Sequence, residues 1–147
     1  MIGNPITQLE QLILNSNAKA FLKETAKWAF FLSIIGFIGI GLLVILAIFS
    51  SAIFNAIPQA KLVPFNLGFA MTIVYSLSGV VYFFPVYYLM QFSTKMKKAL
   101  ETKNDETLAD AFQILKSHYK FIGVFTIITM SLYVMLISVS ILSGAFL

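Results

Sequence analysis

Five side chains in one stretch of the sequence could act as acids, bases or metal ligands: Glu101, Asp105, Glu106, Asp110 and His118. His118 is the only histidine of the chain, and cysteine is absent. Conventional zinc and haem sites draw their ligands from several His and Cys side chains. The carboxylates lie where a helix is expected to begin, a position that suits capping and solvated charge. We therefore predict no catalytic residue, no cofactor and no metal site, and we expect His118 to be an ordinary surface residue.

The elements that carry these side chains are set by three long stretches without any charged residue, 28–54, 65–92 and 121–147. A helix needs roughly 20 apolar residues to cross about 30 Å of bilayer hydrocarbon, and each stretch is longer. Of the 147 residues, 59% are hydrophobic and 11% are charged, whereas soluble domains are about a quarter charged. The sequence predicts an all-α integral membrane helical bundle with three transmembrane helices, an N-terminal amphipathic helix and a cytoplasmic helical hairpin.

One membrane domain, 1–147, is expected, because three spans leave little sequence for a separate soluble unit. Its predicted parts are an amphipathic segment 1–27, a first span 28–54, a second span 65–92, a helical hairpin 93–120 and a third span 121–147. We expect the first span to be retained rather than cleaved, since the apolar core of a signal peptide is usually only about 7–15 residues long.

The basic residues predict how the chain is oriented. All ten are lysines. Nine of them lie in the N-terminal segment or in the loop between spans two and three. By the positive-inside rule, these two regions lie in the cytoplasm and the C-terminus lies outside. The net charge of +4 does not indicate nucleic-acid binding, because the lysines lie beside the span ends, where they face anionic lipid headgroups.

Lysines also mark the N-terminal segment, where Lys19, Lys23 and Lys27 are four residues apart and lie opposite an apolar helix face. Such a helix suits the membrane interface. The row either binds anionic lipid headgroups or simply anchors the start of the first span, and Trp28 at the boundary is typical of the aromatic belt.

Small residues recur along the spans at spacings that allow close helix packing in lipid. The predicted packing positions are Gly36, Gly39, Gly68, Thr72, Ser76, Ser140 and Gly144. The hydroxyl-bearing positions of spans two and three also leave open a polar face that lines a path.

Pro85 lies inside the second span among many aromatic residues. A proline at this position removes a backbone donor to the carbonyl of Val81, so a kink is expected. The kink is interpreted as a fixed bend, with a gating hinge or an aromatic groove for a quinone or lipid as the alternatives.

An amphipathic pattern continues beyond the second span. Its apolar positions are Met96, Leu100, Leu108, Phe112 and Leu115, with a turn of cap-type residues at 102–105. This pattern predicts an antiparallel hairpin that projects into the cytoplasm. Its apolar stripes either bind a partner protein or pack against each other.

Several short motifs resemble a known family. They are Glu24-Thr-Ala-Lys-Trp28, Gly36-Phe-Ile-Gly39, Tyr82-Phe-Phe-Pro85, Lys97-Lys98-Ala-Leu100 and Leu115-Lys-Ser-His-Tyr-Lys-Phe-Ile-Gly123. Together they resemble a family of small bacterial inner-membrane proteins of unknown function, over roughly residues 18–137. The resemblance implies a bacterial inner membrane and assigns no activity.

The function expected from these observations is that of a non-enzymatic accessory or scaffold subunit of a larger membrane complex. Its partners are then membrane lipids and either other membrane subunits or further copies of itself. A homo-oligomeric channel or small-molecule or lipid carrier is the alternative. A membrane-bound enzyme or quinone site near Pro85 is a third reading. Ionisable groups inside the membrane, which ion-driven transporters generally use, are missing from all three spans.

Overall fold

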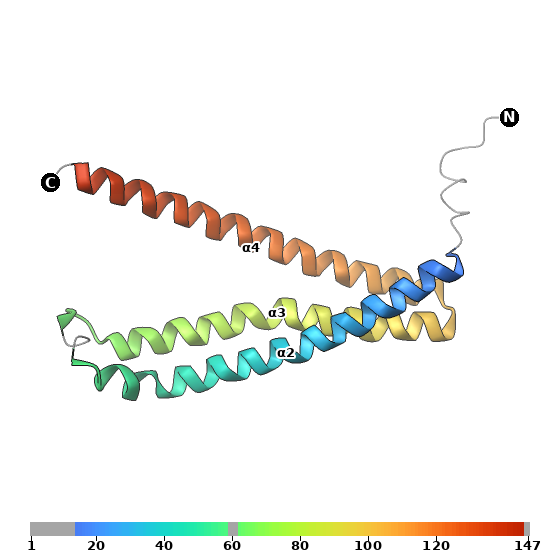
Figure 1. Cartoon of the computed structure of the whole chain (residues 1–147), viewed down its shortest axis with the longest axis horizontal. Coiled ribbons are helices and arrows are strands. Elements are labelled where there is room, and N and C mark those ends of the chain that lie inside the picture. Colours follow the sequence, from blue (N-terminus) through green and yellow to red (C-terminus); the bar gives the residue numbers. More distant parts are fainter. Residues whose placement is uncertain (1–13, 59–61, 146–147) are drawn as a thin grey trace.

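Three long helices make up the computed structural model, which describes residues 14–58 and 62–145 (Figure 1). They are α2 (Ser16–Asn55), α3 (Leu67–Thr102) and α4 (Asp105–Ala145). Each is long and apolar enough to cross a membrane. The all-α prediction is confirmed for the described residues. Of the three predicted spans, residues 28–54 lie in α2, residues 67–92 in α3 and residues 121–145 in α4.

The beginning of α2 differs in detail from the expected layout. Asn15 caps the helix, its side-chain Oδ1 accepting from the Ala18 amide at 2.7 Å. From there the helix runs without interruption into the first span, so 16–27 are its first turns rather than a separate interfacial helix. The continuity follows from the absence of Gly and Pro in this stretch and from the burial of Ala26 against the other helices. Residues 1–13 of the predicted segment lie outside the described residues.

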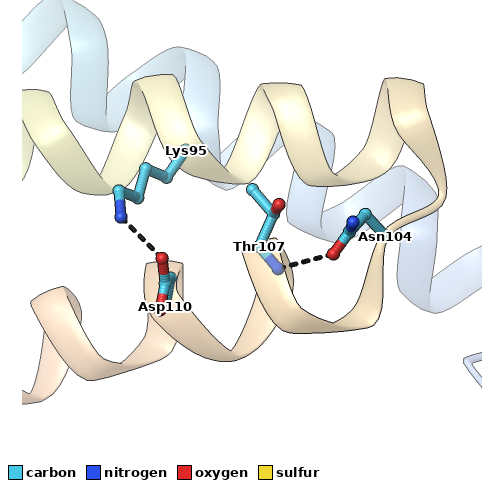
Figure 2. A network of polar contacts seen from close by, with 4 residues as sticks. All are labelled: Lys95, Asn104, Thr107 and Asp110. Atoms are coloured by element: carbon cyan, nitrogen blue, oxygen red, sulfur yellow. Dashed lines mark hydrogen bonds and ion pairs between the residues drawn. The ribbon is translucent and has the colours of Figure 1, made fainter.

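A tight turn joins α3 to α4. The amides of Lys103 and Asn104 both donate to the carbonyl oxygen of Ala99, which closes α3 in a Schellman-type arrangement. Lys103 has a φ of 52°, in the left-handed region. Asn104 then caps α4 by accepting the Thr107 amide at 2.8 Å (Figure 2). The predicted hairpin is therefore two continuous helices joined by a two-residue turn.

Helices α2 and α3 run antiparallel and side by side (Figure 1). The buried residues of α2 are small and fall on two positions of a seven-residue repeat, 26, 33 and 47 on one and 29 and 50 on the other, which is the period of two helices that wrap around each other. They are Ala26, Ala29, Ser33, Ala47 and Ser50. Gly68 is buried on α3 at this contact, where an added Cβ would lie 2.8 Å from Ser51 Cα. Small residues at the contact let the two backbones approach closely.

All three helices meet only near the turn, which we call the hairpin end of the molecule. The buried core there consists of Ala26, Ala29, Phe92, Met96 and Ala111. Toward its C-terminal end, α4 diverges from the other two helices (Figure 1). From Ile122 to Gly144 every residue except the half-buried Thr129 is exposed. The tertiary contacts of α4 are thus concentrated in its first half.

Candidate functional site

The apolar residues predicted to form a partner-binding hairpin lie mostly inside the hairpin end. Met96 is fully buried, and Leu100, Leu108 and Leu115 pack against the same core. Phe112 remains 43% exposed on the outer side of α4. The structure therefore uses most of this stripe to hold α2, α3 and α4 together, which matches the self-packing alternative.

Two lysines of the hairpin join neighbouring helices. Lys95 Nζ lies 2.7 Å from Asp110 Oδ2, linking α3 to α4 (Figure 2). Lys97 Nζ lies 4.4 Å from the centre of the Phe30 ring on α2, a cation–π contact. Glu101, although on α3, stays exposed. Some charged side chains of the hairpin thus make contacts that hold the helices together. The described residues hold no group of three or more potential metal ligands among His, Asp and Glu.

His118 has a specific partner, which the sequence did not indicate. Its Nδ1 lies 2.9 Å from the carbonyl oxygen of Pro85, and both residues are half-buried. Because a carbonyl oxygen only accepts, the imidazole must donate, so Nδ1 carries a proton. The lone histidine of α4 is therefore bonded to the backbone of α3 at the helix-interior proline.

Aromatic rings near Pro85 on α3 also contact rings of α2 and α4. On α3, the rings of Phe83 and Tyr87 are stacked with centroids 5.7 Å apart. Phe84 lies 5.8 Å from Phe121 of α4, and Phe83 lies 6.1 Å from Phe37 of α2. The aromatic half of the second span therefore contacts both neighbours around Pro85.

Buried serine hydroxyls form hydrogen bonds between α2 and α3 at both ends of their contact. Near the hairpin end, Ser93 donates to the carbonyl oxygen of Ala26 at 2.6 Å. At the opposite end, the Ser50 hydroxyl lies 3.2 Å from the carbonyl oxygen of Gly68 and also contacts the Thr72 hydroxyl. Ser50 and Ser93 were not singled out from the sequence. The seven-residue spacing of the small residues on α2 was the signal that could have found Ser50.

The predicted packing residues fall into two groups. A Cβ at Gly36 would lie 2.6 Å from a methyl group of Val86, and one at Gly68 would lie 2.8 Å from Ser51 Cα, so both glycines are at the α2–α3 contact. A Cβ at Gly39 or Gly144 would meet nothing within 4 Å. Ser76 and Ser140 are exposed, as are the predicted headgroup lysines Lys19, Lys23 and Lys27.

A hollow of about 420 Å³ lies on the side of α4 that faces α3, next to the His118 contact. Six of its lining residues come from α4 and one, Tyr88, from α3. Its lining consists of Tyr88, Ser117, Lys120, Phe121, Val124, Phe125 and Ile128. It is a mixed site, with one cation and two hydroxyl-bearing residues beside an apolar surface.

Comparison with protein-family models gives a match over residues 67–141, about half of the chain, to a family of unknown function (DUF5362). The chain belongs to this family. The expected resemblance to a family of unknown function is thereby confirmed. No significant match is found among curated proteins or among solved structures.

The DUF5362 segment coincides with α3, the turn and most of α4. It contains both partners of the His118–Pro85 contact and the whole lining of the 420 Å³ hollow. Helix α2 lies outside the matched segment. The features that join α3 to α4 are thus features of the family portion of the chain.

Proposed function

We propose that this protein is a non-enzymatic accessory or scaffold subunit of a larger complex in the bacterial inner membrane. The observation that carries the proposal is the exposed apolar length of α4 between Ile122 and Gly144. The same chain packs α2 and α3 together with buried small residues, so it has the means to pair helices, yet α4 diverges from that pair. A neighbouring subunit would give α4 the helix contacts that it lacks within the described residues.

The lysine distribution supports an orientation for this subunit. Nine of the ten lysines lie in the N-terminal region or between 95 and 120, at the hairpin end. We infer that this end is cytoplasmic and that the C-terminus of α4 is periplasmic. The cationic end would then face the anionic lipid surface and the cytosol, and the exposed part of α4 would lie in the bilayer.

A homo-oligomeric channel or carrier remains the alternative, with less support from the geometry. Such a path would use the hydroxyls of α4, but several of these donate their protons to carbonyls of their own helix. Thr129, Ser131, Ser138 and Ser140 each bond the carbonyl oxygen four residues earlier, at 2.8 Å. Hydroxyls satisfied in this way offer only acceptor positions to a passing solute.

Site-specific photo-crosslinking in intact membranes tests the proposal. A crosslinking amino acid at Ile127 or Ile141 of α4 is compared with one at Ile48 of α2, and all three positions are between 66% and 69% exposed. We expect adducts with one different polypeptide at both α4 positions and none at Ile48. Adducts of the chain with itself would favour the homo-oligomer, and exclusively lipid adducts at all three positions would refute the subunit proposal.

A further inference from the structure

We propose that the hollow between α3 and α4 binds one phospholipid with an anionic headgroup. This inference goes beyond the proposed subunit role and does not depend on it, because a lipid can occupy the site in the isolated protein. The hollow measures about 420 Å³, within the ~300–1,000 Å³ range of small-molecule sites.

Polar and apolar lining residues are separated along α4, as an amphiphile requires. Lys120 and Ser117 lie in the turns nearer the hairpin end, and Tyr88 adds a phenol from α3. Val124 and Ile128 follow one and two turns further along α4. The positions 117, 121, 124 and 128 share one helix face, and Lys120 lines the hollow beside them. A ligand that lies along this face therefore contacts Lys120 near the hairpin end and the aliphatic side chains further along α4.

The charge of the lining residues indicates which lipid headgroup the hollow would bind. Lys120 is its one cation, and its lining includes no carboxylate. Asp110, the nearest acid of α4 in sequence, is paired with Lys95. The Ser117 hydroxyl already donates to the Gln113 carbonyl oxygen at 3.1 Å, which leaves the ammonium of Lys120 as the principal donor. A phosphate ester matches this arrangement.

The position of Lys120 in the sequence places the site at the membrane boundary. It is the last charged residue before the uncharged stretch 121–147. A lysine there extends its ammonium to headgroup level while the following turns lie in hydrocarbon. A lipid, which has both a phosphate and an acyl chain, therefore fits the hollow better than free phosphate, which would leave Val124 and Ile128 unused.

The walls of the hollow are held in place by contacts outside it. Phe121 rests against Phe84 with ring centroids 5.8 Å apart, and Phe125 lies 6.5 Å from Tyr82. The His118–Pro85 hydrogen bond also joins α4 to α3, one residue along the chain from Ser117 of the lining. A site formed before binding requires little ordering when the lipid arrives.

Native mass spectrometry of the purified protein in a neutral detergent tests the inference, with phosphatidylglycerol and phosphatidylcholine as the added lipids. We expect one phosphatidylglycerol to be retained with at least tenfold preference over phosphatidylcholine. Lys120→Gln should weaken phosphatidylglycerol binding about tenfold, the scale of one charge-assisted hydrogen bond. Lys116→Gln removes the same charge one turn earlier from an exposed lysine outside the hollow and should change nothing.

A second pair of variants tests the apolar part of the site. Val124→Trp fills the hollow without a change of charge and should abolish retention of the lipid, whereas Val134→Trp, at an exposed position further along α4, should not. Equal retention of both lipids, equal losses for the two lysine variants, or unchanged binding by Val124→Trp would each overturn the proposal. Displacement of the lipid by glycerol phosphate at equal concentration would also overturn it, because it would show that the acyl chain contributes nothing.

Discussion

The Nδ1 atom of His118 lies 2.9 Å from the carbonyl oxygen of Pro85, so the only histidine of the chain joins α4 to α3 at the proline inside α3. Four residues further along, from Ile122 onward, nearly all of α4 is exposed. Among the described residues, the His118–Pro85 bond is thus the hydrogen bond between α3 and α4 that lies nearest to this exposed part. We expect it to help set the angle between the two helices.

Replacement of His118 by Leu is expected to loosen that angle. The variant loses the donor but keeps an apolar side chain, so the distribution of α3–α4 distances should broaden while helicity is retained. Because the chain has no cysteine, spin labels can be attached at Ile73→Cys and Val134→Cys, two exposed positions, and the distances measured by electron paramagnetic resonance. Tyr119→Leu, at an exposed neighbouring residue, is the control. An unchanged distribution for His118→Leu would mean that the bond does not position α4.

Ser93→Ala is expected to destabilise the α2–α3 pair. The serine donates across the helices to Ala26, and such bonds contribute about 0.6 kcal/mol and at most about 1.7 kcal/mol in membrane proteins. Ser33→Ala is a matched control, because Ser33 is equally buried but bonds the Phe30 carbonyl of its own helix. Denaturant unfolding in mixed micelles measures both, and equal losses would contradict an interhelical role for Ser93.

Gly68→Ala is expected to cost about 1–3 kcal/mol, the range for overpacked sites. Its new Cβ would approach Ser51 Cα at 2.8 Å, and a backbone atom cannot rotate away. Gly39→Ala, where the Cβ would meet nothing within 4 Å, should instead stabilise the helix by up to about 1 kcal/mol through helix propensity. The two variants are compared by thermal unfolding in detergent, and effects of the same sign would refute the assigned helix faces.

Lys103→Gly is expected to stabilise the turn by about 1 kcal/mol. Lys103 adopts a φ of 52°, which costs a residue with a Cβ about 1–2 kcal/mol and costs glycine little. Lys103→Ala keeps the Cβ and should give no gain, which separates backbone strain from loss of the lysine charge. Thermal unfolding measures both, and an equal gain in the two variants would assign the effect to the loss of the lysine charge.

The architecture followed from the sequence because its signals extend over many residues. Uncharged stretches longer than 20 residues identify membrane helices whatever their neighbours are, and the stripe from Met96 to Leu115 repeats the helical period several times. The turn of cap-type residues predicted at 102–105 contains Asn104, whose side chain accepts the Thr107 amide at the start of α4.

Contacts between helices were harder to predict, because they depend on which faces of two helices meet and on how the helices are shifted along their axes relative to each other. Gly36 and Gly39 look alike in sequence, yet only Gly36 would bring a Cβ against α3. His118 and Pro85 are 33 residues apart, and only the actual lengths of α3 and the turn bring them together. Local patterns contain no information on this register, which is set by close packing at Ala26, Met96 and Ala111.

The confinement of the α4 contacts to its first half has a mechanical consequence. Between His118 and Gly144 the helix extends about 39 Å at 1.5 Å per residue. A rotation of about 10° at the Pro85 contact would therefore move the far tip by about 7 Å. Small shifts in side-chain packing near Pro85 would therefore become large sideways displacements at the far end of α4.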